Sequence, residues 1–486
     1  MPEQRTPADD DRLSRALKNL ELEKDEVPAF NRVRDWIGRG DFANTKAPSS
    51  RTPAVARIAL ATAVILIVAA FGAFNITRMG KHGPPITAVV GTPSPSASPL
   101  ASPSPTPLPT PTPHAVSPLP ATAPPQGSWQ QLAPMATPRK DFTATVLTNG
   151  HVLIAGGQYN SGANGGQATA QVEIFNPSTG KIAPAAQMGV ARAGHTATLL
   201  PDGRVLVAGG YTQLGNQALT SAEIYDPVTG GWSSTGSLNA GRAQHAAVPL
   251  ASGQVLVVGG GAYPANGISP HGSAPAQLAA EIFDPVSGTW STVAKPVLDR
   301  PVHPTATLLP NGRVLVVGGQ YMWNSPDESQ ERSELYDPGS NTWSLVPSDT
   351  RSGARQFQSA TLLPSGQVLV AGGMHDLTPI GAASLYDPAT NSWTELPNMS
   401  ENRCGQGAVL LSTGRVLLVG SGCWADQSAA VEEYDPASYR WFPVAPLSAP
   451  RGFVVAVVAG ADRVVAFGGT IPAGAPTAAV ELFSIR

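Results

Sequence analysis

Short apolar runs separated by turn signals are the most regular feature of the chain, and they continue from residue 129 to the C-terminus. In the clearest copy, an apolar run leads into Asp202-Gly203, a second run covers residues 205–208, and the pair Gly209-Gly210 ends it. Asp-Gly between two apolar runs is typical of a tight β-hairpin. The second run shows no alternation of apolar and polar residues, so we expect a strand that is covered on both faces.

The same unit recurs seven times, with a period of about fifty residues. After each glycine pair come a variable stretch, a third strand that ends as at Asp226-Pro227, and a fourth strand that opens near a Trp, as at Trp232. Four short strands in each unit predict an all-β protein in which seven small sheets stack radially as a propeller. The glycine pairs lie at residues 156/157, 209/210, 259/260, 318/319, 372/373 and 468/469, and Gly420-Ser421 is the imperfect pair.

A glycine pair, then Glu-x-Tyr-Asp-Pro, then Trp is the pattern of the kelch repeat, so the chain resembles a seven-bladed kelch-type β-propeller over residues 128–486. The resemblance is specific because the pattern recurs in order in all seven units. Three positions depart from it: Lys181 stands where Trp is expected, Ser384 where six units have Glu, and Ser484 where other units have Asp or Asn. The repeats and the spacer before them also resemble those of bacterial surface proteins.

The two ends of the repeat region complement each other. It begins with a lone fourth strand, Trp129–Leu132, and it ends with a third strand, Val480–Phe483, that has no fourth strand after it. We therefore expect the N-terminal strand to complete the last blade. This closure would hide the open sheet edges that favour aggregation.

The residues before the repeats divide into three segments. Residues 1–57 are charged, and residues 10–24 carry apolar side chains at helical spacing, which predicts a tail with a short amphipathic helix. Residues 58–76 are nineteen almost uninterrupted apolar residues, long enough for a helix to cross about 30 Å of hydrocarbon. The alternative is a cleaved signal peptide, but its apolar core would lie nearer the N-terminus. Residues 77–127 form a Pro/Ser/Thr-rich linker, which is typical of a semi-rigid stalk.

The two cysteines and the stalk indicate where the propeller lies. Cys404 and Cys423 are the only cysteines, and they are equidistant from the hairpin turn at Thr413-Gly414. We expect them to face each other across two strands and to form a disulfide, the alternative being two buried thiols. A disulfide implies an oxidising compartment. Together these features predict a single-pass cell membrane protein with a cytoplasmic N-terminus and an extracytoplasmic propeller. For residues 10–24 we expect a marginal helix in a poorly ordered tail, the alternative being a helix that binds a cytoplasmic partner.

An Arg precedes the first strand of every unit, and a Glu begins the third strand of six units. A ring of guanidinium groups would bind an anion, whereas Arg–Glu pairs would simply hold the sheets together, and the recurrence in every blade favours the second interpretation. Blade five has Ser384 in place of Glu, so Arg355 or its neighbour Arg403 is a candidate for ligand binding. The recurring arginines are Arg139, Arg192, Arg242, Arg300, Arg355, Arg403 and Arg451.

Residues that break the repeat give further candidates. His195, His245 and His303 lie near the first strands of three consecutive blades and suggest a metal site, but no nearby carboxylate or thiolate completes the ligand set, so we predict no metal. Aromatic side chains and a histidine follow the glycine pairs on the face with long loops, where they can stack on a sugar or anchor a protein, or simply cap the blades. These candidates are Tyr211, Tyr321, Trp323, His375 and Trp424.

The sequence favours a binding protein over an enzyme. No Ser/His/Asp order, phosphate-binding Gly loop or pair of catalytic carboxylates is evident, and a net charge of −3 does not indicate a nucleic-acid partner. We predict a membrane-tethered module without catalytic residues or cofactor, which recognises a carbohydrate or a protein on its long-loop face. The alternatives are a copper-radical oxidase similar to galactose oxidase, whose Cys–Tyr thioether needs a free cysteine, and a transmembrane sensor coupled to the tail.

Overall fold

The structure is a computed structural model of the chain. It describes residues 127–159, 166–213, 217–261, 279–298, 303–319, 333–347, 355–375, 378–423, 427–460, 463–472 and 474–484. The chain divides into two compact units, Met1–Pro111 and Thr112–Arg486. The predicted tail and membrane helix, and the predicted stalk up to residue 126, lie outside the described residues. Within the described ranges, no helix has the length and apolar character that a membrane span requires.

Seven antiparallel sheets of four strands make up the described part of the second unit. Blade one contains β2 (Thr143–Val146), β3 (Val152–Ala155), β4 (Val172–Asn176) and β5 (Lys181–Ala185). Blade two contains β6 (Thr196–Leu199), β7 (Val205–Ala208), β8 (Ala222–Asp226) and β9 (Gly231–Ser234). Blade three contains β10 (Ala246–Pro249), β11 (Val255–Val258), β12 (Glu281–Asp284) and β13 (Thr289–Thr292). Blade four contains β14 (Thr305–Leu308), β15 (Val314–Val317), β16 (Glu334–Asp337) and β17 (Thr342–Leu345).

The remaining blades follow the same plan. Blade five contains β18 (Ser359–Leu362), β19 (Val368–Ala371), β22 (Ala383–Asp387) and β23 (Ser392–Glu395), with a two-stranded extension formed by β20 (Met374–His375) and β21 (Thr378–Pro379). Blade six contains β24 (Gly407–Leu410), β25 (Val416–Ser421), β26 (Ser428–Asp435) and β27 (Arg440–Val444). Blade seven contains β28 (Val455–Val458), β29 (Arg463–Phe467), β30 (Val480–Ser484) and, from the N-terminal side, β1 (Ser128–Gln131).

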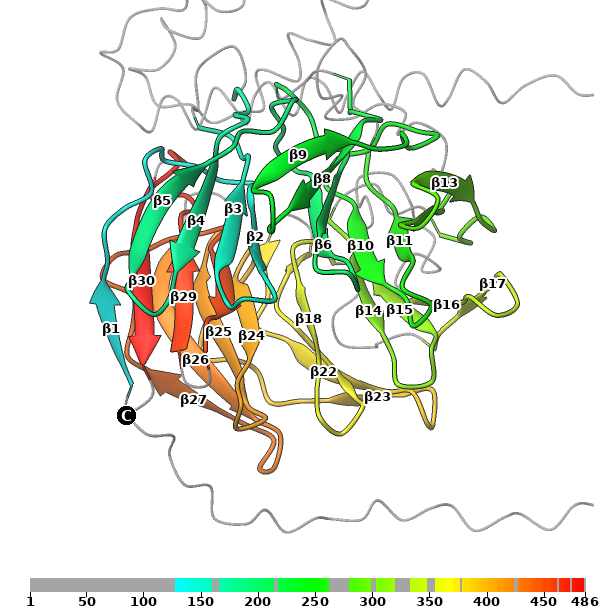
Figure 1. The fold of residues 1–486 in the computed structure, drawn as a ribbon. Helices are drawn as coiled ribbons and strands as arrows, with labels where there is room; N and C mark the ends of the chain where they lie inside the picture. The colour runs from blue at the N-terminus through cyan, green and yellow to red at the C-terminus, as the bar shows by residue number, and fades with distance from the viewer. Residues whose placement is uncertain are drawn as a thin grey trace, which may run out of the picture. The chain divides into compact units, whose positions relative to one another are not determined.

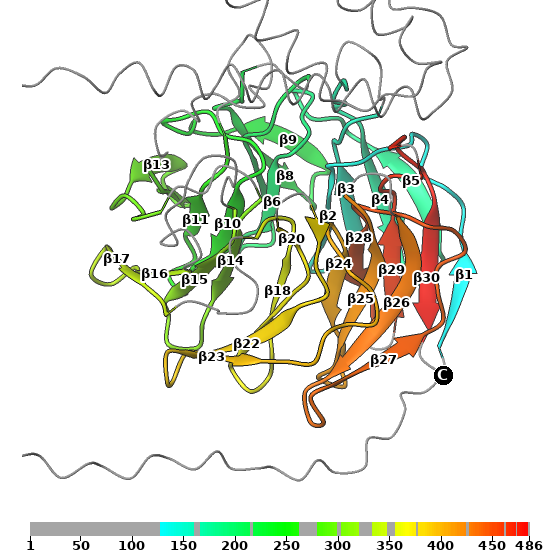
Figure 2. The same ribbon diagram turned by 180° about the vertical axis from the view of Figure 1, so that it is seen from behind.

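The first strand of each blade lies innermost, and these strands surround the axis of the propeller (Figures 1 and 2). Each inner strand contacts those of its two neighbours, and β28 contacts β2, so the ring is closed. The prediction of a seven-bladed, all-β propeller is confirmed.

Local sequence explains each blade. In blade two the hairpin turns at Gly203, whose φ of 86° is a left-handed conformation that glycine adopts without strain. The following strand, β7, is buried at all four positions, as its unbroken apolar run predicts. Side chains on both faces of such a strand pack against neighbouring blades, which is why the strand does not alternate.

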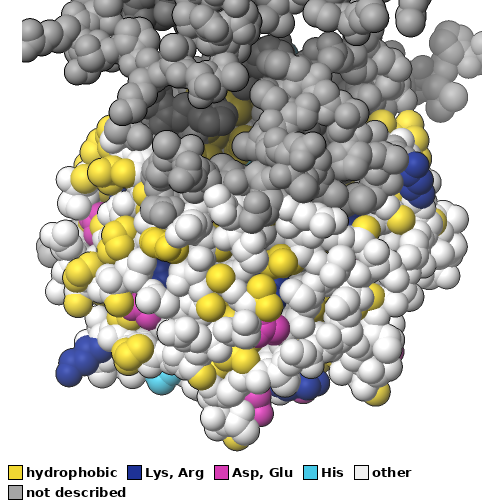
Figure 3. Space-filling model, turned by 90° about the horizontal axis from the view of Figure 1, so that it is seen from above, with side chains coloured by type: hydrophobic (Ala, Val, Ile, Leu, Met, Phe, Trp, Pro, Cys, Tyr) yellow, Lys and Arg dark blue, Asp and Glu magenta, His cyan; other side chains and the backbone are white. Residues whose placement is uncertain are grey.

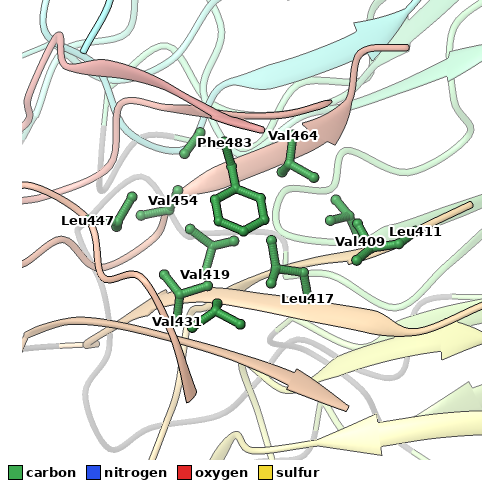
Figure 4. Packing of buried hydrophobic residues seen from close by; sticks show 11 residues of the cluster. Val409, Leu411, Leu417, Val419, Val431, Leu447, Val454, Val464 and Phe483 are labelled. Carbon is green, nitrogen blue, oxygen red and sulfur yellow. The ribbon is translucent and has the colours of Figure 1, made fainter. Parts of the chain in front are cut away.

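The N-terminal strand closes the ring as predicted. β1 pairs antiparallel with β30, with Trp129 opposite Phe483 and the two rings 5.0 Å apart. The Trp129 indole also donates a hydrogen bond of 2.8 Å to the Ala445 carbonyl in blade six. Phe483 itself lies at the centre of an apolar cluster between blades six and seven, surrounded by Val419, Val464 and other aliphatic side chains (Figure 4). Residues at the two ends of the repeat region thus share one core.

One detail of the repeat alignment is corrected by the strand register. Trp232 pairs with Tyr225 in blade two, and in blade one the residue that pairs with Phe175 is Ile182, not Lys181. Ile182 therefore occupies the Trp position of blade one, where it packs into the apolar core and provides no indole donor.

Candidate functional site

Buried Arg–Glu pairs hold the repeating frame together. In blade two, Arg192 Nη2 lies 2.7 Å from Glu223 Oε1, and Arg192 Nη1 donates to the carbonyl of Gly209 in the glycine pair. Glu223 also accepts hydrogen bonds from the backbone N–H groups of Gly189 and Val190, in the connection that arrives from blade one. One carboxylate therefore joins the arginine, its own sheet and the connection between two blades. The same pair recurs as Arg139–Glu173 at 2.7 Å, Arg242–Glu281 at 2.6 Å and Arg451–Glu481 at 2.6 Å.

The pKa values of these pairs are shifted because the pairs are buried. Burial lowers the pKa of Arg192, and the hydrogen bond and charge of Glu223 oppose that shift. In blade six the pair is wider, because Arg403 Nη2 lies 3.7 Å from Glu432 Oε1. There burial raises the pKa of Glu432, and the charge of Arg403 opposes the shift. The prediction that Arg–Glu pairs form part of the architecture agrees with these contacts.

The two arginines predicted as ligand residues lie inside their blades. Arg403 is fully buried and donates to the carbonyls of Gly420 and Ala430, in addition to its ion pair. Arg355 is 2% exposed and donates to the Gly372 carbonyl at 3.2 Å. Ser384, which replaces Glu in blade five, is buried, and its hydroxyl has no hydrogen-bond partner within the structure's described residues. Ligand binding by these arginines stays a prediction, and a ligand would have to reach buried groups.

His195 and His245 bridge neighbouring inner strands. His195 Nε2 lies 3.1 Å from the Thr143 hydroxyl of blade one, and His245 Nε2 lies 2.9 Å from the Thr196 hydroxyl of blade two. Burial, with the nearby charge of Arg192, lowers the pKa of His195 to about 3, and burial also lowers the pKa of His245 well below its usual value. These imidazoles are neutral structural links between blades.

His303 does not occupy the same position as the other two histidines. It has a left-handed backbone with φ of 47°, which in the neighbouring blades is found at Gln244 and Phe357. Gln244 directly precedes His245 in the sequence, so His303 occupies the repeat position before that of His195 and His245. The three imidazoles therefore do not form one set. Within the described ranges, no three His, Cys, Asp or Glu side chains are grouped as a metal site.

The position of His303 defines a ring around the axis, on the face where the long loops begin. Its seven members, one from each blade, all have φ between 47° and 61° and are half-buried, whereas the arginines two residues before them are buried wherever they are described. We call this set the axial ring. It consists of Asp141, Gly194, Gln244, His303, Phe357, Gly405 and Phe453.

Backbone hydrogen bonds fix the axial ring from blade to blade. The Gly194 N–H donates to the Asp141 carbonyl at 2.8 Å, and the Gln244 N–H donates to the Gly194 carbonyl at 2.7 Å. Equivalent bonds join His303 to Gln244 and Gly405 to Phe357, each at 3.0 Å. The backbone of the ring is therefore repeated, while its seven positions hold five different residue types.

Polar side chains gather on one side of the ring. The Tyr211 hydroxyl lies 3.1 Å from Asp141 Oδ2 and 3.2 Å from Gln158 Oε1. Tyr211 is itself fully buried, so it holds the Asp141 carboxylate from within the protein. A Cβ at Gly194 would come within 3.0 Å of the Tyr211 ring, which explains why this position has no side chain.

Aromatic side chains occupy the other side of the ring. The rings of His303 and Phe357 lie 4.3 Å apart, and those of Phe357 and Phe453 meet edge to face at 5.5 Å. Beneath them, Cys404 and Cys423 form the predicted disulfide, with a Cα–Cα distance of 5.7 Å. The disulfide packs with Met374 against Phe357 and Phe453.

The other predicted contact residues are placed as follows. His375 is half-buried in the β20–β21 hairpin of blade five. Tyr321, Trp323 and Trp424 lie outside the described residues. The axial ring was not predicted. A signal was available, because six of its seven members lie two residues after a recurring arginine.

Comparisons with known proteins agree with this architecture. A model of the Kelch motif matches residues 191–239 and 360–400, which correspond to blades two and five. This chain contains a kelch-repeat, seven-bladed β-propeller. A comparison with curated protein sequences finds no match. Among solved structures, the propeller is similar to a fungal alcohol oxidase of the AA5 family in complex with copper, with a TM-score of 0.59 and 18% identity over 74% of this chain and 76% of that one. At this identity the likeness shows the shared fold alone.

The kelch propeller does not fit the copper centre that its resemblance to copper-radical oxidases implies. Such a centre needs a thioether-linked Cys–Tyr pair together with His and Tyr ligands. Both cysteines of this chain are joined to each other, and His195 and His245 face threonine hydroxyls between the blades. The axial ring contributes a single imidazole, that of His303.

Proposed function

We propose that this kelch propeller is a membrane-tethered, extracytoplasmic binding module that recognises a glycan or a protein partner through its long-loop face. The observation that carries the proposal is the contrast between constant and variable positions. The Arg–Glu frame repeats from blade to blade, whereas the axial ring presents acid, amide, imidazole and phenyl groups on one repeated backbone. Variable residues on a rigid frame are typical of a binding surface.

The location outside the cytoplasm rests on two features. The disulfide between Cys404 and Cys423 is the kind of bond that persists in oxidising compartments. The apolar segment at residues 58–76 and the Pro-rich linker after it have the composition of an anchor and a stalk. A protease added outside intact cells should release the propeller from the full-length chain. If the propeller resists this treatment and is cut only after cell lysis, the topology is wrong.

The surface chemistry favours a ligand without strong net charge. On the edge of the propeller, which is drawn in Figure 3, most side chains of the described residues are apolar or uncharged. Charged residues make up only 13% of the chain. The full-length chain, purified in detergent, should therefore bind a component of a glycan array or a surface protein with little dependence on salt, and loss of binding in moderate salt would oppose this view.

An oxidase is the alternative that the sequence resemblance implies, although both cysteines of the chain are joined to each other. Metal analysis of the purified full-length chain, combined with an alcohol oxidase assay, decides between the two. Stoichiometric copper with turnover would establish the enzyme, and copper without turnover, or no copper after loading, would favour the binding module.

A further inference from the structure

We propose that the axial ring binds the terminal hexopyranose of a glycan, with Phe357 and Phe453 against the apolar face of the sugar and Asp141 and Gln244 toward its hydroxyl groups. This inference rests on the proposed binding function and assigns its site and ligand class. It differs from the predicted contacts, which lie on the longer loops and in the recurring arginines.

The backbone of the ring supplies a rigid platform. Each member holds a left-handed conformation, which residues other than glycine adopt only where the surrounding structure imposes it. Hydrogen bonds between neighbouring blades, such as that from Gln244 N–H to the Gly194 carbonyl, fix these conformations. Because the platform is common to all blades, the side chains alone can distinguish one ligand from another, and a sugar would bind without reordering the backbone.

The polar side of the ring suits hydroxyl groups. The buried Tyr211 hydroxyl lies 3.1 Å from Asp141 Oδ2, so it orients the carboxylate, whose other oxygen can accept from a sugar hydroxyl. The side-chain amide of Gln244 has both donor and acceptor atoms, as a hydroxyl group requires. Glycine at position 194, between them along the ring, leaves this side without a further side chain.

The aromatic side suits the apolar face of a sugar ring. Phe357 and Phe453 are half-buried and meet edge to face, and His303 stacks on Phe357. A Cβ at Gly405, which lies between the two phenylalanines along the ring, would approach the Phe453 ring to 3.1 Å. The absence of a side chain there allows the two phenyl rings to approach each other, and the disulfide beneath them fixes their positions.

The charges of the ring favour a neutral ligand. None of its seven members is Lys or Arg. Burial lowers the pKa of His303 to about 4, with the charge of Asp141 opposing the shift, and the imidazole is therefore neutral near pH 7. One carboxylate, one amide and a set of aromatic faces match a polyhydroxylated ring.

The test is a glycan array probed with the full-length chain in detergent, followed by titration with the methyl glycoside of the best-bound terminal sugar. We expect Phe453→Ala and Phe357→Ala each to weaken binding at least tenfold, and Asp141→Ala to do the same. Tyr211→Phe, which removes the hydroxyl that contacts Asp141 and Gln158 but leaves the Asp141 carboxylate in place, should weaken binding less. Tyr159→Ala is the matched control, because Tyr159 is an aromatic residue on the same face, 38% exposed and outside the ring.

The outcomes separate this inference from the proposed function. If the chain binds glycans and the phenylalanine variants remain folded and bind equally well, the ring is not the site, although the binding function stands. If no glycan binds but a surface protein is captured through the long-loop face, the sugar assignment is wrong. Equal binding of tetramethylammonium and the methyl glycoside would also overturn it, because the ring would then be a cation site.

Discussion

The interior of the blades and the axial ring differ in what the repeat keeps constant. In the interior, the pair formed by Arg192 and Glu223 recurs with nearly the same distance in blades one, three and seven. In the axial ring, the backbone conformation recurs in every blade but the side chain varies, for example from a carboxylate at Asp141 to a phenyl ring at Phe453. In the function that we propose, the constant pairs provide stability and the variable ring provides recognition.

The largest expected effect comes from breaking one interior pair. Glu223→Gln leaves the buried Arg192 without its counter-ion, and we expect the free energy of unfolding to fall by about 3–5 kcal/mol. Asp202→Asn is the matched control, because the Arg204–Asp202 pair has the same 2.7 Å distance but side chains that are 36% and 46% exposed. That variant should lose less than about 1 kcal/mol. Denaturant titration measures both, and equal losses would contradict the importance of the buried pairs.

The disulfide should come next in effect. Its 19-residue separation corresponds to about 3 kcal/mol in the chain-entropy model. We expect reductant to lower the denaturation midpoint of the wild-type chain and to leave a Cys404→Ala/Cys423→Ala double variant unchanged. A wild-type midpoint that does not respond to reductant, together with two free thiols by mass spectrometry, would argue against the bond.

A pH dependence should follow from the histidines that bridge the inner strands. The folded-state pKa of His195 is lowered to about 3, whereas the unfolded chain titrates near the model-peptide value of about 6.5. The unfolded state therefore binds protons first, and the stabilisation is present above about pH 6.5 and is lost as the pH falls below it, by about 1.4 kcal/mol per pH unit. His195→Gln introduces the residue that blades five and six have as Gln358 and Gln406. Denaturation at several pH values should show a smaller slope in this variant, and an identical slope would contradict the assignment.

Two phenylalanines of blade seven allow the smallest effect to be isolated. Phe483 is buried at 1% exposure between blades, so Phe483→Ala should cost about 3–5 kcal/mol. Phe453 is half-buried in the axial ring, so Phe453→Ala should lower the free energy of unfolding by only about 1 kcal/mol. Thermal unfolding compares the two directly. A larger loss for Phe453 than for Phe483 would mean that the ring serves stability.

The features of the fold that were predicted from the sequence are those that recur in every unit. The hairpin at Gly203 and the closure by Trp129 depend on apolar runs and turn residues, which are visible in the chain. The Trp position of blade one was assigned to Lys181 instead of Ile182, because register depends on the strand pairing and a shift of one residue is not evident without it.

The axial ring was not predicted from the sequence, and the reason is conformational. Arg355 and Tyr211 stood out by chemistry, yet both are buried beneath the face that they were expected to form. The axial ring depends on a left-handed backbone at residues such as Phe357, for which a bulky side chain gives no signal. His303 was grouped with His195 because the two are only one position apart in the repeat. His303 corresponds to Gly194, the residue before His195, and a shift of one residue is not evident from the sequence.

We propose that the ligand contacts the axial ring. Hydroxyl-radical footprinting of the full-length chain, with and without its best-bound glycan, tests it most directly, because it reports the solvent exposure of individual side chains. We predict that the glycan protects Phe357, Phe453 and His303 while oxidation of Tyr159 stays unchanged. Protection of Tyr159 with no change at the three ring residues would contradict the claim.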